Sequence, residues 1–144
     1  MGKPQDRKRI VRSLLDLLDG QRGVCVISTA VLEEVTAASL AVQDAIHRGF
    51  KHCPPELFFV TDYVKFLALG YISAGILPAQ RRLDALHIAA ATCHGHDFLV
   101  SWDHRHLTRP TKKLQFETLA KTRGFLKTPQ ICNPLEARDE LRAR

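Results

Sequence analysis

The sequence predicts an α/β fold in which helices cover both faces of a mostly parallel central sheet, a three-layer arrangement. Two features of the chain lead to this expectation. Short apolar runs rich in β-branched residues alternate with longer segments whose apolar residues recur every three or four positions. Glycines and prolines separate the two kinds of segment. Strands that alternate with helices in this way usually pair in parallel and are buried on both faces.

Each element follows from its local pattern. Three apolar runs are predicted strands, namely GVCVIS at 23–28, LFFV at 57–60 and DFLVSW at 97–102, and a brief extended piece is expected around Ile131. Helical periodicity predicts helices at 5–18, 62–74, 78–93 and 111–122 and from Pro134 onward. Asn133 is expected to cap the last of them. Ser28 and Thr29 are expected to cap a helix that carries VLEEV, and the mixed segment from Thr36 is expected to be helical to about Phe50.

Length and composition predict a single domain over residues 1–144, since 144 residues with 45% hydrophobic content can bury one core of ordinary size. No apolar stretch approaches the roughly 20 residues that span a bilayer, and the first ten residues are mostly polar. We therefore expect a cytoplasmic protein without membrane contact. The four cysteines form no CxxC pair, which favours reduced core thiols.

The charge balance favours a polyanionic partner. Lys and Arg number 21 and Asp and Glu number 15, so the net charge is +6. The chain contains no phosphate-binding GxxxxGK[ST] loop, no GxGxxG after a strand, no GxSxG and no HExxH. These absences remove the usual sequence support for nucleotide-triphosphate, dinucleotide, serine-hydrolase and zinc-protease functions.

Three acids stand out once the predicted layout is assumed. Glu34 follows the first predicted strand, Asp84 begins an otherwise apolar helix, and Asp103 follows the run FLVSW. In parallel sheets the ligand site lies beyond the carboxyl ends of the strands. Carboxylates that converge there repel one another unless a hard cation such as Mg²⁺ or Mn²⁺ binds between them. Such a metal activates water and neutralises charge on a phosphodiester.

Basic residues near these acids are candidates for holding an RNA backbone. They are Arg81, Arg82, Arg105, Arg109, Lys112 and Lys113.

The same acids also fit ordinary structural roles. Asp84 suits the N-terminal part of a helix, Asp103 suits the turn after a strand, and Glu34 suits a solvated helix face. The pattern alone leaves both interpretations open. The nearby histidines of CHGH and HRH match no ordinary zinc spacing, and His87 is expected to be a buried, hydrogen-bonded core residue.

The stretch DALHIAAATCHGHDFLVSWDHRHL at 84–107 resembles the signature of PIN-domain proteins, especially the VapC-like toxins of type II toxin–antitoxin systems. The earlier ISTAVLEEV resembles the family's second strand and the helix that bears its acid, and TPQICNPLE resembles its C-terminal ending. The resemblance implies a metal-dependent ribonuclease with Mg²⁺ or Mn²⁺ bound by Glu34, Asp84 and Asp103. It also implies that Ser101 orients the metal or its water.

The resemblance further implies an antitoxin partner and a homodimer. One departure from the family's pattern affects the expected activity. PIN domains begin with a central strand that ends in an acidic metal ligand, and nothing of that kind precedes the first predicted helix. Three readings follow: the sequence is a shortened one, the domain has lost catalysis, or another chain supplies the strand. The alternative function is therefore a catalytically inactive PIN-derived module that binds RNA or protein.

Overall fold

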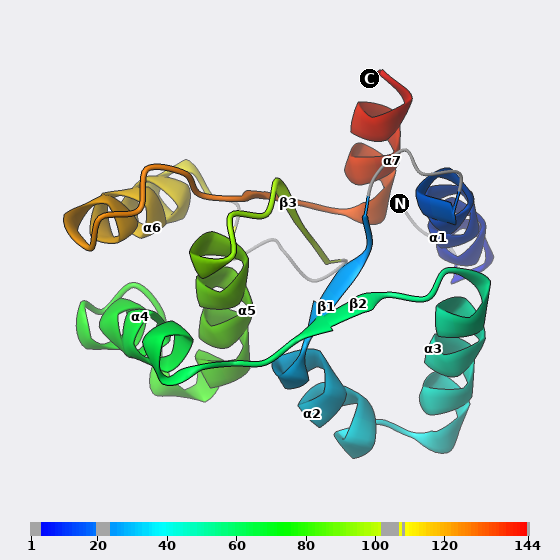
Figure 1. Ribbon diagram of the computed structural model, residues 1–144, viewed down its shortest axis with the longest axis horizontal. Helices are drawn as coiled ribbons and strands as arrows, with labels where there is room; N and C mark the ends of the chain where they lie inside the picture. The colour runs from blue at the N-terminus through cyan, green and yellow to red at the C-terminus, as the bar shows by residue number, and fades with distance from the viewer. Residues whose placement is uncertain (1–3, 20–23, 102–106, 108, 144) are drawn as a thin grey trace. The chain divides into compact units, whose positions relative to one another are not determined.

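The computed structural model describes residues 4–19, 24–101, 107 and 109–143. The chain divides into two compact units (Figure 1). The terminal unit takes in Met1–Phe58 and Asn133–Arg144, and the central unit takes in Phe59–Cys132. The division into two units does not test the prediction of a single domain over residues 1–144.

The terminal unit combines four helices and two strands among its described residues. Their bounds are α1 (Pro4–Asp19), β1 (Val26–Ser28), α2 (Thr29–Ala37), α3 (Leu40–His52), β2 (Glu56–Phe58) and α7 (Pro134–Arg142). Strands β1 and β2 pair in parallel, with Ile27 opposite Leu57. The Glu56 amide donates to the Cys25 carbonyl at 2.9 Å, which extends the pairing by one residue.

Helices α1 and α7 pack together in the terminal unit. Leu14 of α1 and Ala137 and Leu141 of α7 are buried. At the edge of this contact the Arg142 guanidinium donates to the Ser13 hydroxyl at 3.1 Å. Burial of these apolar side chains stabilises helices that would be marginal alone.

The central unit holds a 3₁₀ turn, three helices and two strands within its described part. Their bounds are α4 (Asp62–Ser73), η1 (Ala79–Arg81), α5 (Arg82–Cys93), β3 (Phe98–Val100), α6 (Pro110–Thr122) and β4 (Gln130–Cys132). Strands β3 and β4 are parallel, with Leu99 opposite Ile131. The Ser101 amide donates to the Cys132 carbonyl at 2.9 Å, so the ladder continues one residue past β3.

Helix α5 is the buried centre of this unit. Its alanines, among them Ala85 and Ala89, are buried against α4, and their small side chains let the two helices approach closely. Tyr71 of α4 is fully buried, and its ring meets Phe116 of α6 edge to face at 5.1 Å. Figure 1 shows α4, α5 and α6 as neighbouring helices of this unit.

The expected α/β character and the parallel pairing are confirmed. The strands are shorter than the apolar runs predicted, because only three residues of each run pair. The described strands form two separate two-stranded sheets, β1 with β2 and β3 with β4, where one larger sheet was expected. Two-stranded sheets are marginal by themselves, so the packed helices supply most of the stability of each unit. The helix expected at VLEEV is α2, the segment expected to be helical to about Phe50 contains α3, and Ala38 and Ser39 lie between the two helices.

Candidate functional site

Asp84 lies in the first turn of α5, which begins at Arg82 and not at Pro78 as expected, because residues 79–81 form the 3₁₀ turn η1. Its side chain is 26% exposed, and Oδ2 lies 3.5 Å from the nearest guanidinium nitrogen of Arg81. The next residues on the helix, Ala85 and Leu86, are buried. A long, partly solvated ion pair of this kind contributes little to stability and leaves the carboxylate accessible to other cations. His87 was expected to be buried in the core, and this prediction is wrong, because its side chain is half-buried.

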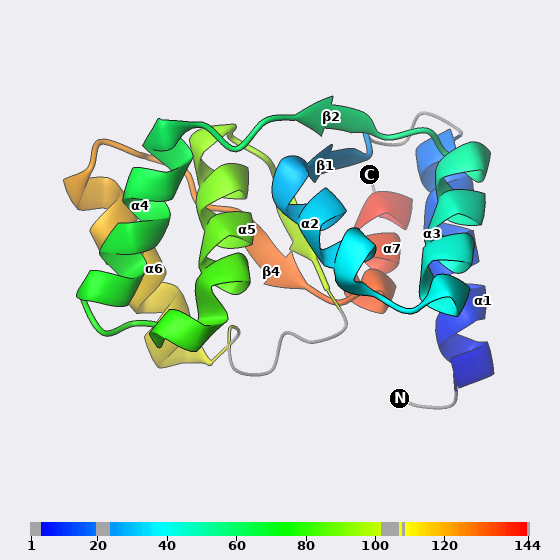
Figure 2. The ribbon, with the colours of Figure 1, turned by 90° about the horizontal axis from the view of Figure 1, so that it is seen from below.

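Ser101 lies at the same end of the central unit as Asp84. The chain leaves α5 at His94, turns at Gly95 with φ of +68°, and returns as β3. Figure 2 shows α5 and β3 running in opposite directions. The residues that begin α5 and those that follow β3 therefore lie at one edge, the carboxyl end of the strand, where α/β proteins place ligand sites.

Several of the predicted RNA-binding cations lie at this edge. Arg81 ends η1 and Arg82 begins α5. Lys112, in the first turn of α6, donates from Nζ to the Ile76 carbonyl, which lies just before η1. Arg109 is the exposed N-cap residue of α6. The hydrogen bond from Lys112 thus brings the beginning of α6 beside the beginning of α5.

The other predicted site residues are placed differently. Glu34 lies on α2, in the terminal unit, and its side chain falls outside the described part of the structure. Asp103 and Arg105 lie outside the described residues altogether. Asp84 and Ser101 are therefore the predicted active-site residues that the structure brings to one edge.

The part of the chain that the structure describes contains no cluster of metal ligands. Among residues 4–19, 24–101, 107 and 109–143, no three His, Cys, Asp or Glu side chains form a group that could hold a metal ion. His94 and His96 lie with their rings stacked at 6.0 Å. Burial is the main cause that lowers the pKa of His96. Cys93, His94 and His96 of the CHGH motif all lie within the described residues and belong to no such metal-binding group.

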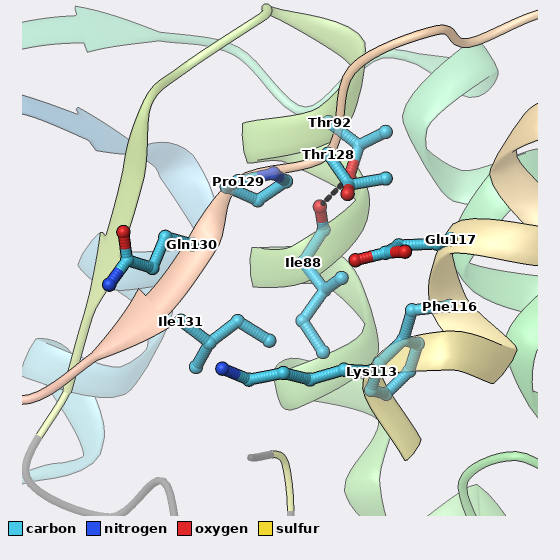
Figure 3. Close-up of a pocket in the computed structure, with 9 residues that line it drawn as sticks. All are labelled: Ile88, Thr92, Lys113, Phe116, Glu117, Thr128, Pro129, Gln130 and Ile131. Carbon is cyan, nitrogen blue, oxygen red and sulfur yellow. Dashed lines mark hydrogen bonds between the residues drawn. The ribbon is translucent and has the colours of Figure 1, made fainter. Parts of the chain in front are cut away.

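Lys113, the remaining predicted cation, lines a cavity of about 220 Å³ in the central unit. Figure 3 shows its side chain and that of Glu117 extending from α6 toward α5 and β4. Ile88, Phe116 and Ile131 supply apolar walls. The cavity is smaller than the roughly 300–1,000 Å³ of sites for drug-sized ligands. The lining of the cavity combines a cation and a carboxylate one helical turn apart on α6 with residues 128–131. The sequence did not predict this cavity, because these two segments meet only when the chain is folded.

The four cysteines are free thiols, with Cys53 and Cys132 buried. Burial is the main reason that the pKa of Cys25 is raised to about 11, so this thiol is unreactive at neutral pH. No helix in the described ranges is both long enough and apolar enough to span a bilayer.

Comparisons with models of known protein families, with curated proteins and with solved structures each give no match. The features of this chain that bear on its function are therefore its own side chains, above all Asp84 and Ser101 at one edge of the central unit.

Proposed function

We propose that this chain is a PIN-like ribonuclease that depends on Mg²⁺ or Mn²⁺ and acts as the toxin of a type II toxin–antitoxin pair. The observation that carries the proposal is the position of Asp84. A partly exposed carboxylate begins an otherwise buried helix, at the edge where β3 ends and where Arg81 and Lys112 also lie. Negative charge at a metal and positive charge for a phosphate backbone are the two requirements of such a nuclease.

The oxygen ligands suit a hard cation. Asp84 would hold the metal, with Glu34 and Asp103 as further ligands and Ser101 positioning bound water. A bound Mg²⁺ or Mn²⁺ would supply an activated water and offset charge on the phosphodiester. An antitoxin partner, RNA as substrate and a homodimer belong to the same proposal.

A second function is favoured by the basic edge where Arg81, Arg109 and Lys112 lie, because cations can hold an RNA backbone without a metal. In this alternative the chain is an inactive PIN-derived module that binds RNA or protein. The same basic edge would then bind RNA without cleaving it.

The experiment combines calorimetric titration of Mn²⁺ with cleavage of a mixed-sequence RNA. Asp84→Asn is expected to remove Mn²⁺ binding and to reduce cleavage by roughly two orders of magnitude or more, an effect typical of losing a group that activates the nucleophile. EDTA should have the same effect. The matched control is Asp97→Asn, because Asp97 is an exposed carboxylate of the same unit that pairs with Lys127 at 2.6 Å.

The three outcomes are distinct. Cleavage that needs Mn²⁺ and is lost in Asp84→Asn but kept in Asp97→Asn supports the ribonuclease. RNA binding without cleavage at any Mn²⁺ concentration supports the inactive module. Metal-dependent cleavage that survives Asp84→Asn rejects the site described above.

A further inference from the structure

A second surface of the central unit combines exposed aromatic rings with cations. Tyr63 and Phe66 of α4 are 58% and 59% exposed, although Val64 and Leu67 between and beside them are buried. Residues three apart on a helix lie on the same face, so the two rings are neighbours. A contiguous group of exposed large rings marks a binding surface more often than isolated ones do.

The segment after α6 completes this surface. The Phe125 ring lies 5.7 Å from the Tyr63 ring, tilted by 51°. The guanidinium carbon of Arg123 lies 4.3 Å from the centre of the Phe66 ring, within the range of a cation–π contact. Lys65, the residue before Phe66 on α4, is exposed. We name these five residues, Tyr63, Lys65, Phe66, Arg123 and Phe125, the aromatic–cationic surface.

Ion pairing distinguishes the two cations of this surface from their neighbour Lys127. Within the described residues, neither Lys65 nor the Arg123 guanidinium takes part in an ion pair, whereas Lys127 nearby is paired with Asp97. The Arg123 guanidinium lies close to α4, since its Nη2 would lie 2.8 Å from a Cβ added at Gly70, and its Nη1 is buried without a hydrogen bond to the described residues. The absence of a side chain at Gly70 therefore leaves room for the guanidinium beside Phe66.

We infer that the aromatic–cationic surface binds single-stranded RNA through its bases. Each base presents a π-face that stacks on an aromatic ring, and unpaired cations attract the phosphates that join the bases. The excess of six positive charges on the chain favours a polyanion over a protein as the partner. Tyr, Phe and Arg are also common in protein interfaces, and sedimentation distinguishes that partner in the test below. The choice of RNA as the nucleic acid rests on the proposed ribonuclease function. The inference adds a second place on the protein where that RNA binds.

This surface and Asp84 lie at opposite ends of α5. Lys127, two residues after Phe125, donates to the Gly95 carbonyl at 3.2 Å, and Gly95 follows the last turn of α5. A helix of 12 residues spans about 18 Å. At about 3.4 Å per stacked nucleotide, an RNA that reaches both ends needs roughly five nucleotides or more.

The test is fluorescence anisotropy with fluorescein-labelled oligouridine in EDTA, where metal-dependent cleavage cannot occur. Tyr63→Leu and Phe66→Leu keep apolar bulk but remove the π-face, and each should weaken binding on the order of tenfold. Phe66→Tyr keeps a ring and should bind as the unchanged chain does. Leu114→Ala is the matched control, because Leu114 is an equally exposed apolar residue of the same unit on α6.

Two results would overturn the inference. One is unchanged oligouridine binding in both leucine variants. The other comes from sedimentation: the unchanged chain self-associates, the leucine variants do not, and oligouridine binding is the same in all of them. The surface would then be a protein interface. If the leucine variants bind weakly and Asp84→Asn binds normally, the inference stands, and cleavage in Mn²⁺ then decides the proposed catalysis separately.

Discussion

At the scale of single residues, Tyr71 carries a buried hydroxyl in the core of the central unit. The side chain is fully buried, and its Oη donates no hydrogen bond to the described residues. Burial is the largest of the causes that raise the pKa of Tyr71 to about 12. The Thr92 hydroxyl acts against burial and lies near enough to lower the pKa of Tyr71, but it donates to the Ile88 carbonyl. A buried donor without a partner costs free energy that its ring, packed on Phe116, offsets.

Tyr71→Phe should remove a pH dependence of stability. The unfolded phenol loses its proton near pH 10, whereas the folded one keeps it until about pH 12. The unfolded state therefore binds fewer protons in this window, and the unfolding free energy falls as the pH rises, by on the order of 3 kcal/mol at its end. The measurement is thermal or urea unfolding across this window.

The phenylalanine variant provides the comparison, since lysines that titrate in the same range are common to both chains. At neutral pH the two chains should differ by less than about 1 kcal/mol, because the deleted hydroxyl has no acceptor to lose. Equal slopes against pH in both chains would contradict the prediction.

The surroundings of Asp84 depend partly on neighbours in sequence and partly on distant residues. Its place at the beginning of α5 follows from the apolar run ALHIAAA behind it, and the structure confirms that place. Its nearness to Arg81 follows from sequence spacing too. The link between Lys112 and Ile76 does not, because the two residues are far apart in the chain and only packing of α6 brings them together.

At the scale of elements, helix boundaries follow the local pattern closely. Asn133 caps α7 as predicted, accepting from the Glu136 amide at 2.8 Å while the Glu136 side chain accepts from the Asn133 amide at 3.1 Å. This reciprocal capping box was readable as Asn, Pro and Glu in sequence. Ser39 was not predicted as a cap, although it caps α3 by accepting from the Val42 amide.

Asn133→Ala should destabilise the protein by about 1 kcal/mol, because the Glu136 amide loses its acceptor at the end of α7. For a chain of this length the midpoint of thermal unfolding should fall by roughly 3–5 °C. Circular dichroism on heating measures it.

The control is Asn133→Asp, which keeps an oxygen that accepts from the Glu136 amide and adds favourable charge at a helix N-terminus. That variant should be at least as stable as the unchanged chain. An alanine variant with an unaltered midpoint would show that the cap contributes nothing.

At the scale of the whole molecule, net charge governs the proposed interaction with RNA. The excess of six positive charges attracts a polyanion, and binding through phosphates releases counterions. Arg109 is exposed, and no ion pair to it is found within the described residues. Its charge is therefore available at the edge where α6 begins.

Arg109→Gln should weaken oligouridine binding and lower the slope of log K against log salt by about 0.7 for a single strand. Anisotropy titrations at several salt concentrations measure the slope. Arg138→Gln is the control, since Arg138 already lies 3.4 Å from Asp139. A slope that changes equally in both variants would indicate a general charge effect with no special role for the α6 edge.

The sequence by itself determined the alternation of helices and strands, the Asn133 cap and the position of Asp84 in its helix, because each of these depends on residues close together in the chain. The parallel pairing was expected from that alternation, but it joins strands that are far apart in the chain. Only the tertiary structure decided that the described strands pair as two separate sheets, that Lys112 joins α6 to the beginning of α5, and that Arg123 and Phe125 complete a surface begun by Tyr63 and Phe66. The physical reason is that periodicity and capping are local, whereas these contacts join segments whose meeting depends on how buried side chains pack.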